Sequence, residues 1–346
     1  MTAADGVRIA CASAGTGAPL VKAPTWLSHV GMDGDSPVWR HWWEALARDH
    51  FFLRFDQRGS GLSDRVVPEL SFASWVSDLE NVVDAFGLER FVLFGMSQGG
   101  PLAVEYAARH PERVSRLVIV GGYTRGWARR GHATDEHLAL LTLIERGWAT
   151  DNPAFRQVFT SQFMPDATAD QMRWFNDLER VSTSAENAVL FQKAVGDIDV
   201  TESAKRLRVP TLIFHSQDDA RVPAEQGREL AALIPTARLV FLPSNNHILL
   251  ETEPAWPMFL QELETFLADP AYTDVLPGIA ADVQPLTTRE LEVLRLIARG
   301  LTDREISTEL GVSARTVGNH VQAILNKTGC TNRTAAAMWA AKMSLV

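Results

Sequence analysis

A serine at a sharp turn between an apolar run and a helix constrains the fold of this chain more than any other feature. The run Arg90–Phe94 leads into Gly95-Met96-Ser97-Gln98-Gly99, and a helical pattern begins at once. A serine in so tight a turn sits in strained backbone, so its neighbours must be small enough for other backbone segments to approach. This G-x-S-x-G pattern predicts that the Ser97 hydroxyl stands above a sheet edge, at a helix N-terminus that favours developing negative charge.

The segments around this turn alternate between strand-like and helix-like patterns over roughly the first 270 residues. Strands are expected at seven short apolar runs, namely Val7–Ala12, Thr25–His29, Phe51–Phe55, Arg90–Phe94, Arg116–Val120, Pro210–His215 and Leu239–Leu242. Helices are expected at five segments between them, namely Val38–Ala47, Phe72–Phe86, Gly99–Arg109, Ala224–Leu233 and Pro257–Leu267. Because most strand candidates are apolar throughout, they are typical of strands buried on both faces. The pattern predicts an α/β fold with a mostly parallel sheet covered by helices.

The alternation is interrupted by a helical, aromatic-rich insertion of about residues 121–209. Aromatic side chains recur in it at four-residue steps, as at Phe155, Phe159 and Phe163. Such an insertion either covers a ligand site as a lid or only packs its own core, and both interpretations are open. If it is a lid, it predicts an apolar ligand pocket whose candidate residues are His29, Trp127, Trp148, Phe159 and Trp174.

Two later loops carry the groups that would make Ser97 a nucleophile, because a serine hydroxyl needs a base that is itself oriented by a carboxylate. The sixth predicted strand is followed by a loop with Asp218 and Asp219, and the seventh by a loop with His247. Both loops follow the carboxyl ends of strands, at the edge where such sheets bind ligands. The sequence therefore predicts a triad of Ser97, one of the two aspartates, and His247.

Residues 1–269 resemble the α/β-hydrolases of the esterase, lipase and non-haem haloperoxidase kind. The resemblance rests on the turn at Ser97, the acid and histidine loops, and the run Asp56-Gln57-Arg58-Gly59-Ser60-Gly61-Leu62-Ser63-Asp64. The family's acid loop, G-x-x-D-x-x-V-P, matches Ser216–Pro223 with Ser216 in place of the glycine. This match selects Asp219 as the acid of the triad, with Asp218 as the alternative. The family fold implies a helical lid, and no cofactor or metal is expected.

The same resemblance implies an oxyanion hole built from two backbone N–H groups. One is the N–H of Gln98, directly after the nucleophile. The family often carries the other just after a His-Gly pair, and the equivalent stretch here is Thr25-Trp26-Leu27-Ser28-His29-Val30-Gly31. The preferred match puts His29 in the place of the glycine and makes Val30 the second donor. A match shifted by one residue is the alternative.

A proline-containing stretch separates this body from a short tail of different charge. Asp269–Pro285 has three prolines and no long periodic pattern, which predicts a linker over 270–285 and a second domain over 286–346. Eight basic and five acidic side chains occur from Val283 onwards, a net charge of +3, which leaves −12 for the rest of a chain whose total is −9. The acidic body disfavours a nucleic-acid surface, whereas the mildly basic tail permits one.

Four helices are expected in the tail, and glycines at positions 300, 311 and 329 end the first three. A tight turn at Gly311 joins the second helix to the third, so the pair forms a helix-turn-helix whose second helix can enter a DNA major groove. A generic four-helix bundle is the alternative. The outer face of the third helix favours DNA binding, because its donor-bearing side chains suit phosphates and base edges: Arg315, Thr316, Asn319, Gln322 and Lys327.

The tail closely resembles the LuxR-type DNA-binding domain over about its whole length. The matching positions are Leu286-Thr287-x-Arg289-Glu290, Val293-Leu294, Gly300-Leu301, Glu305-Ile306, Leu310-Gly311-Val312-Ser313, Thr316-Val317-x-x-His320 and Asn332-Arg333-Thr334. The resemblance implies base contacts around positions 318, 319 and 322 and DNA-backbone contacts from Thr316, Lys327 and Arg333. It also implies dimerisation through the fourth helix, where Trp339 and Met343 are the candidates.

Composition narrows the setting in which such a chain works. At 46% hydrophobic and 22% charged residues, it is a globular chain rather than a disordered one. No apolar run approaches the roughly 18 residues that a membrane span needs, and the N-terminus lacks the pattern of a secretory signal. Only two cysteines occur, Cys11 and Cys330, which favours a reducing cytoplasm and argues against a disulfide framework.

Three functions are open on this basis. The first is a ligand-responsive transcription regulator, a homodimer whose body senses a small molecule and whose tail binds a two-fold site on double-stranded DNA. The second is a serine hydrolase of esters or lactones that uses Ser97, Asp219 and His247, with a secondary tail. The third combines them, with slow turnover resetting the sensor. A serine at the turn favours an acyl-type ligand or another carbonyl compound, and the aromatic insertion favours an apolar portion.

Overall fold

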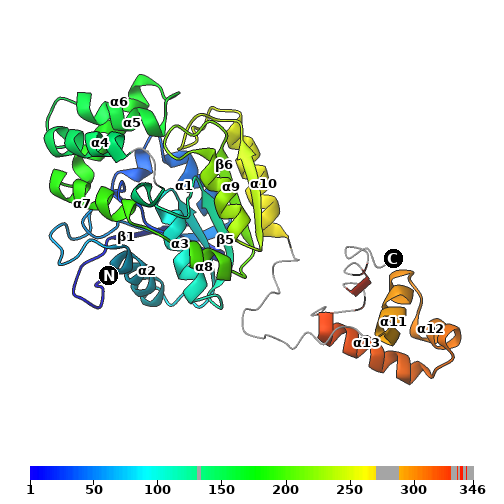
Figure 1. Ribbon diagram of the computed structural model, residues 1–346. Helices are drawn as coiled ribbons and strands as arrows, with labels where there is room; N and C mark the ends of the chain where they lie inside the picture. The colour runs from blue at the N-terminus through cyan, green and yellow to red at the C-terminus, as the bar shows by residue number, and fades with distance from the viewer. Residues whose placement is uncertain (131–133, 270–287, 329–332, 334–335, 338–339, 341–346) are drawn as a thin grey trace. The chain divides into compact units, whose positions relative to one another are not determined.

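The chain folds into two compact units, Met1–Val275 and Leu276–Val346. The computed structural model describes residues 1–130, 134–269 and 288–328, together with residues 333, 336–337 and 340 (Figure 1). The expected linker, 270–285, lies outside these described residues.

A seven-stranded sheet forms the centre of the first unit (Figure 1). Its strand order is β1-β3-β2-β4-β5-β6-β7, and every neighbouring pair is parallel except the antiparallel pair β1 and β3. The strands are β1 Cys11–Ala14, β2 Ala18–Lys22, β3 His50–Phe55, β4 Phe91–Met96, β5 Val114–Val120, β6 Thr211–Ser216 and β7 Ala237–Leu242. The α/β fold with a mostly parallel sheet is therefore confirmed, and β4, which leads to Ser97, lies near its centre.

One expected strand is wrong. Residues 25–29 form no strand, and the strand beside β4 is instead Ala18–Lys22, which pairs with both β3 and β4. Lys22, the last residue of this strand, is 5% exposed, so its polar side chain lies inside the sheet. The segment from Ala23 onwards is consequently a loop above the sheet edge. The first strand is also shifted, from the expected Val7–Ala12 to Cys11–Ala14.

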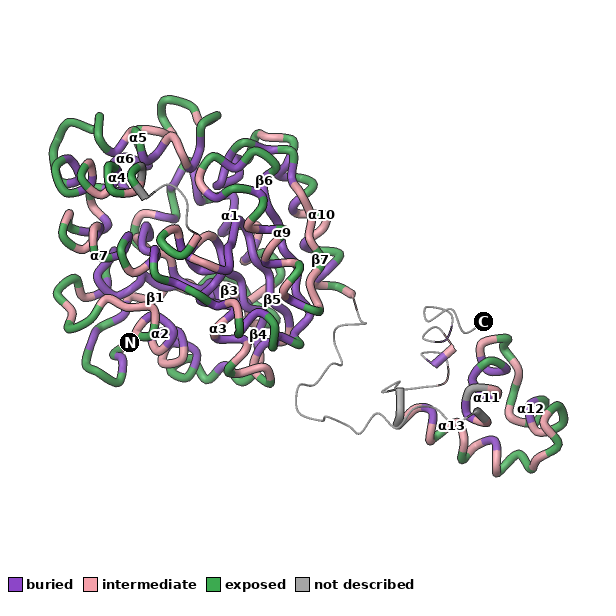
Figure 2. The backbone as a smooth tube through the Cα atoms, viewed as in Figure 1, coloured by how far each residue is buried: buried purple, intermediate pink, exposed green. Residues whose placement is uncertain are grey.

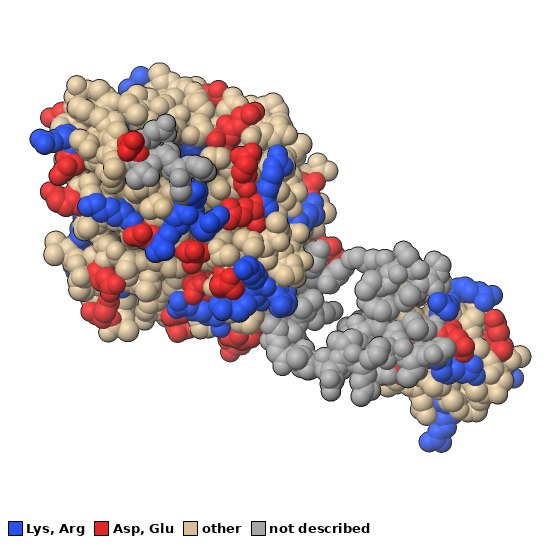
Figure 3. Space-filling model, viewed as in Figure 1, with Lys and Arg blue, Asp and Glu red and all other residues tan. Residues whose placement is uncertain are grey.

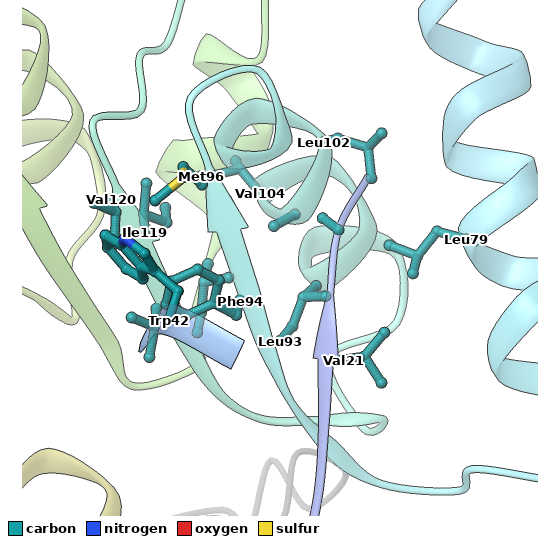
Figure 4. Close-up of a cluster of buried hydrophobic side chains, with 14 of the residues drawn as sticks. Val21, Trp42, Leu79, Leu93, Phe94, Met96, Leu102, Val104, Ile119 and Val120 are labelled. Carbon is teal, nitrogen blue, oxygen red and sulfur yellow. The ribbon is translucent and has the colours of Figure 1, made fainter. Parts of the chain in front are cut away.

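Two helical layers cover the sheet. Helices α1 Arg40–Ala47 and α10 Ala255–Ala268 lie together, because the ring of Trp42 is 4.9 Å from that of Phe259. Helices α2 Phe72–Ala85, α3 Gly99–Arg109, α8 Thr201–Arg206 and α9 Ala224–Leu233 contact one another in that order. Buried residues follow the strands through the middle of the unit (Figure 2). In the close-up of this core, Trp42 lies against Phe94 on one side of β4, and Leu79 and Leu102 come from helices near its neighbour β2 (Figure 4).

The insertion between β5 and β6 is helical, as expected. It contains η2 Trp127–Arg129, α4 Thr134–Gly147, α5 Ala154–Phe163, α6 Ala169–Ser182 and α7 Ala185–Gly196. Aromatic side chains are buried within it, among them Trp148, Phe159, Phe175 and Phe191. We call α4 to α7 the lid. The last helix of the insertion, α8, packs on α3 and α9 and belongs to the body.

The second unit has three described helices, α11 Thr288–Ala298, α12 Asp303–Leu310 and α13 Ala314–Thr328. Their buried side chains, including Leu294, Ile306, Val317 and Ile324, form a core separate from that of the first unit. Gly311 ends α12 with φ +65°, a left-handed conformation that favours glycine over any residue with a Cβ. Residues 329–332, 338–339 and 341–346, with the expected Trp339 and Met343, lie outside the described residues. No helix of the described part of either unit is long and apolar enough to span a membrane.

Candidate functional site

The turn at Ser97 has the strained geometry that its sequence predicts. Ser97 has φ 50°, the one positive value outside glycine among the described residues. It follows the wholly buried β4, and its N–H donates to the carbonyl of Val120 at 2.8 Å. A Cβ on Gly95 would lie 2.5 Å from the carbonyl oxygen of Gly99, so only glycine fits at that position. The hydroxyl is thus held at the carboxyl end of a central strand, directly before α3.

An aspartate and a histidine meet at the same edge of the sheet. Asp219 follows β6, His247 follows β7, and Oδ2 of Asp219 lies 2.7 Å from Nδ1 of His247. His247 is 2% exposed, and its Nε2 has no hydrogen-bond partner among the described residues. Ser97 and His247 line one cavity. The structure therefore brings together the three residues expected to form the triad, and it leaves one ring nitrogen of His247 available to the cavity.

The surroundings of Asp219 keep it ionised. Burial favours the neutral acid, but His247, the backbone N–H of Val222 and His215 stabilise the carboxylate, and the net effect lowers the pKa of Asp219. The N–H groups of Arg221 and Val222 both donate to its Oδ1 at 2.8 Å. His215 donates from Nε2 to the carbonyl of Val222, and its own burial lowers its pKa. An ionised Asp219 fixes the ring of His247 with a proton on Nδ1 and a lone pair on Nε2. Asp218 makes no such contact with His247.

The cavity beside Ser97 is small and mostly apolar. Its volume is about 40 Å³, room for only a few water molecules. Its lining residues come from the loop after β2, from α1, from the turn at Ser97, from the lid and from the histidine loop: Thr25, Trp26, Leu27, Trp39, Met96, Ser97, Gln98, Phe163, Phe175, His247 and Ile248. The aromatic side chains Phe163 of α5 and Phe175 of α6 show that lid helices form part of the wall.

The aromatic residues expected to line the pocket do not line the cavity itself. Trp148 and Phe159 are buried behind Trp26, with ring centroids 5.4 and 5.6 Å from its ring, so they support the wall from outside. Trp127 donates its indole N–H to the carbonyl of Gln192 and lies outside the cavity lining. Trp174 also lies outside it. Phe163 and Phe175 were missed as lining residues, because helical spacing alone does not say which turn of a helix reaches the serine.

Two further expectations for the loop after β2 are wrong. The N–H of Val30 donates to both carboxylate oxygens of Asp56, at 3.0 Å each, so it cannot be the second oxyanion donor. His29 is absent from the lining of the serine cavity. The cause is the misplaced strand: since β2 ends at Lys22, the first loop residues past the strand are the ones beside Ser97. The correct end of β2 would have shown which loop residues lie beside Ser97, whereas the His-Val-Gly sequence did not.

Trp26 occupies the place that was expected for Val30. Its N–H donates to Oε1 of Gln98 over a long 3.3 Å, and Nε2 of Gln98 donates to Oε1 of Gln57 at 3.1 Å. The hydroxyl of Ser60 donates to the carbonyl of Trp26. Gln98 also begins α3, where a backbone N–H has no partner within the helix. Gln98 and Trp26 are thus linked to each other, and both line the same cavity as Ser97.

The residues expected to contact DNA lie mainly on α13. Arg315 and Asn319 are exposed, Thr316 is half-buried with its hydroxyl bonded to that of Ser313, and Gln322 is exposed one turn further on. Lys327 lies in the last turn of the same helix. On the first unit, by contrast, acidic and basic side chains are interleaved over the visible face (Figure 3). The exposed donors on α13 therefore form a candidate nucleic-acid interface.

Arg333 differs from its expected role. Its guanidinium contacts the carboxylate of Asp303 and the carbonyl of Leu301, at the N-terminal end of α12. It thus joins the C-terminal part of the module to the first helix of the helix-turn-helix. A contact between Arg333 and the DNA backbone would require it to give up these partners.

Comparisons with known proteins match each unit to a family. The family model described as "alpha/beta hydrolase fold" matches residues 27–254, and the one described as "Bacterial regulatory proteins, luxR family" matches residues 284–340. The protein named "Putative carbamate hydrolase RutD" from Azorhizobium caulinodans is 30% identical over 239 residues, which cover 65% of this chain and 82% of that relative. The protein of the same name from Caulobacter sp. is 26% identical over 253 residues, covering 69% and 89%.

Solved structures share the fold of the first unit. The esterase EaEST from Exiguobacterium antarcticum has a TM-score of 0.66 at 24% identity and covers 78% of this chain and 98% of its own. A bromoperoxidase from Bacillus anthracis has a TM-score of 0.63 at 23% identity, with 76% and 96% covered. At this level of identity, the likeness bears on the fold and not on the substrate.

Proposed function

We propose that this chain is a transcription regulator that responds to a small acyl-type ligand. The chain belongs to the alpha/beta hydrolase fold family, and it carries a C-terminal domain of the luxR family of bacterial regulatory proteins. The observation that carries the proposal is the occurrence, in one chain, of a small, mostly apolar cavity at Ser97 and a helix-turn-helix with exposed donors. The partners are double-stranded DNA and a small ester, lactone or other carbonyl compound with an apolar portion. In this proposal the protein works in the cytoplasm and binds, as a homodimer, a DNA site with two-fold symmetry.

The cavity is suited to bind a carbonyl group. The hydroxyl of Ser97 would lie beneath the carbonyl carbon, and the backbone N–H groups of Gln98 and Trp26 would face its oxygen. The N–H of Trp26 would then exchange its long bond to the side chain of Gln98 for the ligand oxygen. The apolar part of the ligand would contact Phe163 and Phe175, which belong to lid helices, and entry of the ligand would displace the lid.

A second function, serine ester or carbamate hydrolysis, is favoured by the contact between Asp219 and His247. In this reaction Nε2 of His247 takes the proton of Ser97 as its oxygen bonds to the carbonyl carbon. The same proton then passes from His247 to the leaving alcohol or amine as the bond between the carbonyl carbon and the leaving group breaks. This step leaves an acyl group on Ser97. Water then attacks with His247 again as the base, and the acid and free serine are released. The name of the RutD relatives suggests carbamates as one substrate class.

The two functions are compatible, because slow hydrolysis would reset a sensor by destroying its ligand. They make different demands on Ser97. A sensor needs the shape of the cavity, whereas a hydrolase needs the hydroxyl itself.

The test of the second function is a burst experiment with 4-nitrophenyl butyrate, an activated short-chain ester. We expect up to one nitrophenol per chain in the burst, and Ser97→Ala is expected to lower the rate by about 1,000-fold or more. Ser161→Ala is the matched control, since the Ser161 hydroxyl bonds only to the lid carbonyl of Val158 in the described part of the chain. Persistent hydrolysis by the Ser97→Ala variant would mean that another nucleophile acts.

A protein without a burst that still binds DNA in a ligand-dependent way would remove the hydrolase candidate and leave the sensor. Hydrolysis without any sequence-selective DNA binding would do the reverse.

A further inference from the structure

A cation without an ion pair lies beneath the lid, two residues after Asp219. The guanidinium of Arg221 donates to Oε1 of Gln162 on α5 at 2.9 Å and to Oε1 of Gln192 on α7 at 3.2 Å. Both partners are neutral amides. No carboxylate of the described residues lies within 4.0 Å of this guanidinium, although ion pairs of other arginines are numerous in the same unit.

The surroundings of Arg221 are apolar and aromatic. Its Cζ lies 4.7 Å from the ring centroid of Phe159 and 5.4 Å from that of Phe163. Burial lowers the pKa of Arg221 to about 10, so the group stays charged at neutral pH in a place that disfavours charge. The residue nevertheless keeps part of its surface accessible. A cation that is largely buried and has no ion pair reduces the stability of the fold unless an anion binds to it. The exposed part of Arg221 allows such an anion to reach it.

Other polar groups near Arg221 also lack partners. The hydroxyl of Tyr123, Nε2 of Gln192 and both carboxyl oxygens of Glu179 are buried without hydrogen bonds among the described residues. Tyr123, Asp219 and Glu179 lie close enough to Arg221 to stabilise its charge, and the second cation Arg130 lies close enough to oppose it, but none of these acids forms an ion pair with the guanidinium. Burial raises the pKa of Glu179 well above its ordinary value, and its carboxyl oxygens make no hydrogen bond to the guanidinium of Arg221. The hydroxyl of Tyr123 and the amide of Gln192 are donors that an anion can use.

This group of side chains adjoins the serine cavity. Phe163 lines that cavity, lies with its ring centroid 5.6 Å from that of His247, and also contacts Arg221. Phe159 contacts both Arg221 and Trp26, which lines the same cavity. Phe163 therefore belongs both to the wall of the serine cavity and to the surroundings of Arg221, so a shift of this ring would join the two.

We propose that Arg221 is the anion-binding residue of the ligand pocket, and that the ligand carries a carboxylate at the end remote from the carbonyl group held at Ser97. Tyr123 and Gln192 supply neutral donors to the same carboxylate. The ligand's carboxylate replaces the amide oxygens of Gln162 and Gln192 on the guanidinium, so its binding loosens the link between the acid loop and lid helices α5 and α7. This inference rests on the proposed function, because it names the ligand class of the same pocket.

The test compares two stable esters of similar length on the full chain carrying Ser97→Ala, which removes turnover. Monomethyl glutarate has a terminal carboxylate, and methyl butyrate has none. Binding is followed by the change in tryptophan fluorescence, since Trp26 and Trp148 lie at the pocket, and by the shift in melting temperature. We expect monomethyl glutarate to bind at least about tenfold more tightly than methyl butyrate.

Adding Arg221→Gln is expected to bring the two affinities within about twofold of each other. Arg130→Gln is the matched control, because Arg130 is another cation near Tyr123 whose guanidinium is bonded to the carbonyl of Arg125. That control is expected to keep the preference for the carboxylate. The comparison of the two esters needs no change at position 221, so it stands even if the Arg221→Gln chain fails to fold.

Equal binding of the two esters, or binding of neither, would overturn the proposal. A loss of affinity for both esters on Arg221→Gln would assign Arg221 a purely structural role in joining the lid to the acid loop. The experiment uses neither DNA nor turnover, so a carboxylate preference that persists in a protein without DNA binding would contradict the regulator and leave the ligand class in place.

Discussion

Lys22 places a primary amine inside the sheet, behind the loop that flanks Ser97. Its Nζ lies 3.3 Å from the carbonyl oxygen of Ala23, 3.5 Å from the hydroxyl of Thr25 and 5.7 Å from the ring centroid of Trp43, so all of these contacts are long. Nearby, Arg54 and Asp33 form an ion pair at 3.0 Å. Burial lowers the pKa of Lys22 from its ordinary 10.5 to about 8 and raises that of Asp33 to about 7. A buried amine with such partners reduces the stability of the fold while it is charged.

Replacing this amine is therefore expected to stabilise the protein. Lys22→Met should raise the free energy of unfolding at pH 7 by about 1–3 kcal/mol, because the charged amine is buried at a cost. The folded protein releases the proton near pH 8 and the unfolded chain near pH 10.5, so the wild type gains stability as the pH rises between these values. The advantage of the variant is full below pH 8 and shrinks towards pH 10.5.

Urea unfolding at pH 7, 9 and 10 measures this difference. Lys205→Met is the control, because Lys205 is exposed and pairs with Glu202 on the surface, so its replacement removes no buried charge. A Lys22→Met variant less stable than the wild type at pH 7 would mean that the amine has a strong partner in the folded protein.

Single residues also show the limits of sequence reasoning at the site. Ser97, Asp219 and His247 were predictable because each follows a strand that the apolar pattern locates, and strand ends in a parallel sheet share one edge. Val30 was assigned from letters resembling His-Gly, and its N–H is bonded to Asp56 instead. Arg221 carried no signal in the sequence, because an arginine in a loop is ordinarily a solvated surface residue.

Secondary-structure elements were predictable where the local sequence pattern agrees with the burial of the element, and were missed where it does not. Helix α3 was expected at Gly99–Arg109 and has those bounds, since a glycine-rich turn begins it and its apolar stripe packs on β4. Strand β2 was missed because it contains Pro19 and Lys22, residues that ordinarily end strands. Pairing on both sides with β3 and β4 outweighs those local preferences, and tertiary contacts of this kind are invisible in the sequence.

Within the second unit, α13 is the element that we propose recognises DNA. Arg315 is exposed in its first turn, so its guanidinium is free to meet a phosphate. Arg315→Ala is expected to weaken binding to all DNA sequences alike and to reduce the slope of log affinity against log salt concentration by about 0.9. The measurement is fluorescence anisotropy with a labelled duplex between 50 and 300 mM salt, conditions spanning roughly the range in which such slopes are resolved.

Arg299→Ala removes the same charge from a position near the end of α11, where the guanidinium pairs with Glu309. This control should leave the slope unchanged. An Arg315→Ala slope equal to that of the wild type would count against a phosphate contact from α13.

On the scale of the whole molecule, each unit has its own hydrophobic core, one built around the sheet and one around Leu294, Ile306 and Val317. Each unit can thus fold around its own core, and communication between them must use a change of state within the first unit. We propose that the lid supplies such a change, because α5 and α6 carry two of the side chains that line the small serine cavity, Phe163 and Phe175. On this proposal, ligand entry shifts the lid, and the position of the lid governs DNA binding by the second unit.

The measurement that tests the account most directly is the DNA affinity of the full chain before and after covalent occupation of Ser97 by a fluorophosphonate. The DNA is first selected from genomic fragments with the unmodified protein. We predict a two-fold symmetric sequence whose affinity changes at least about fivefold when Ser97 is occupied, with no change for the Ser97→Ala protein treated in the same way. Failure to select any sequence, or the same affinity with and without the group on Ser97, would contradict the account.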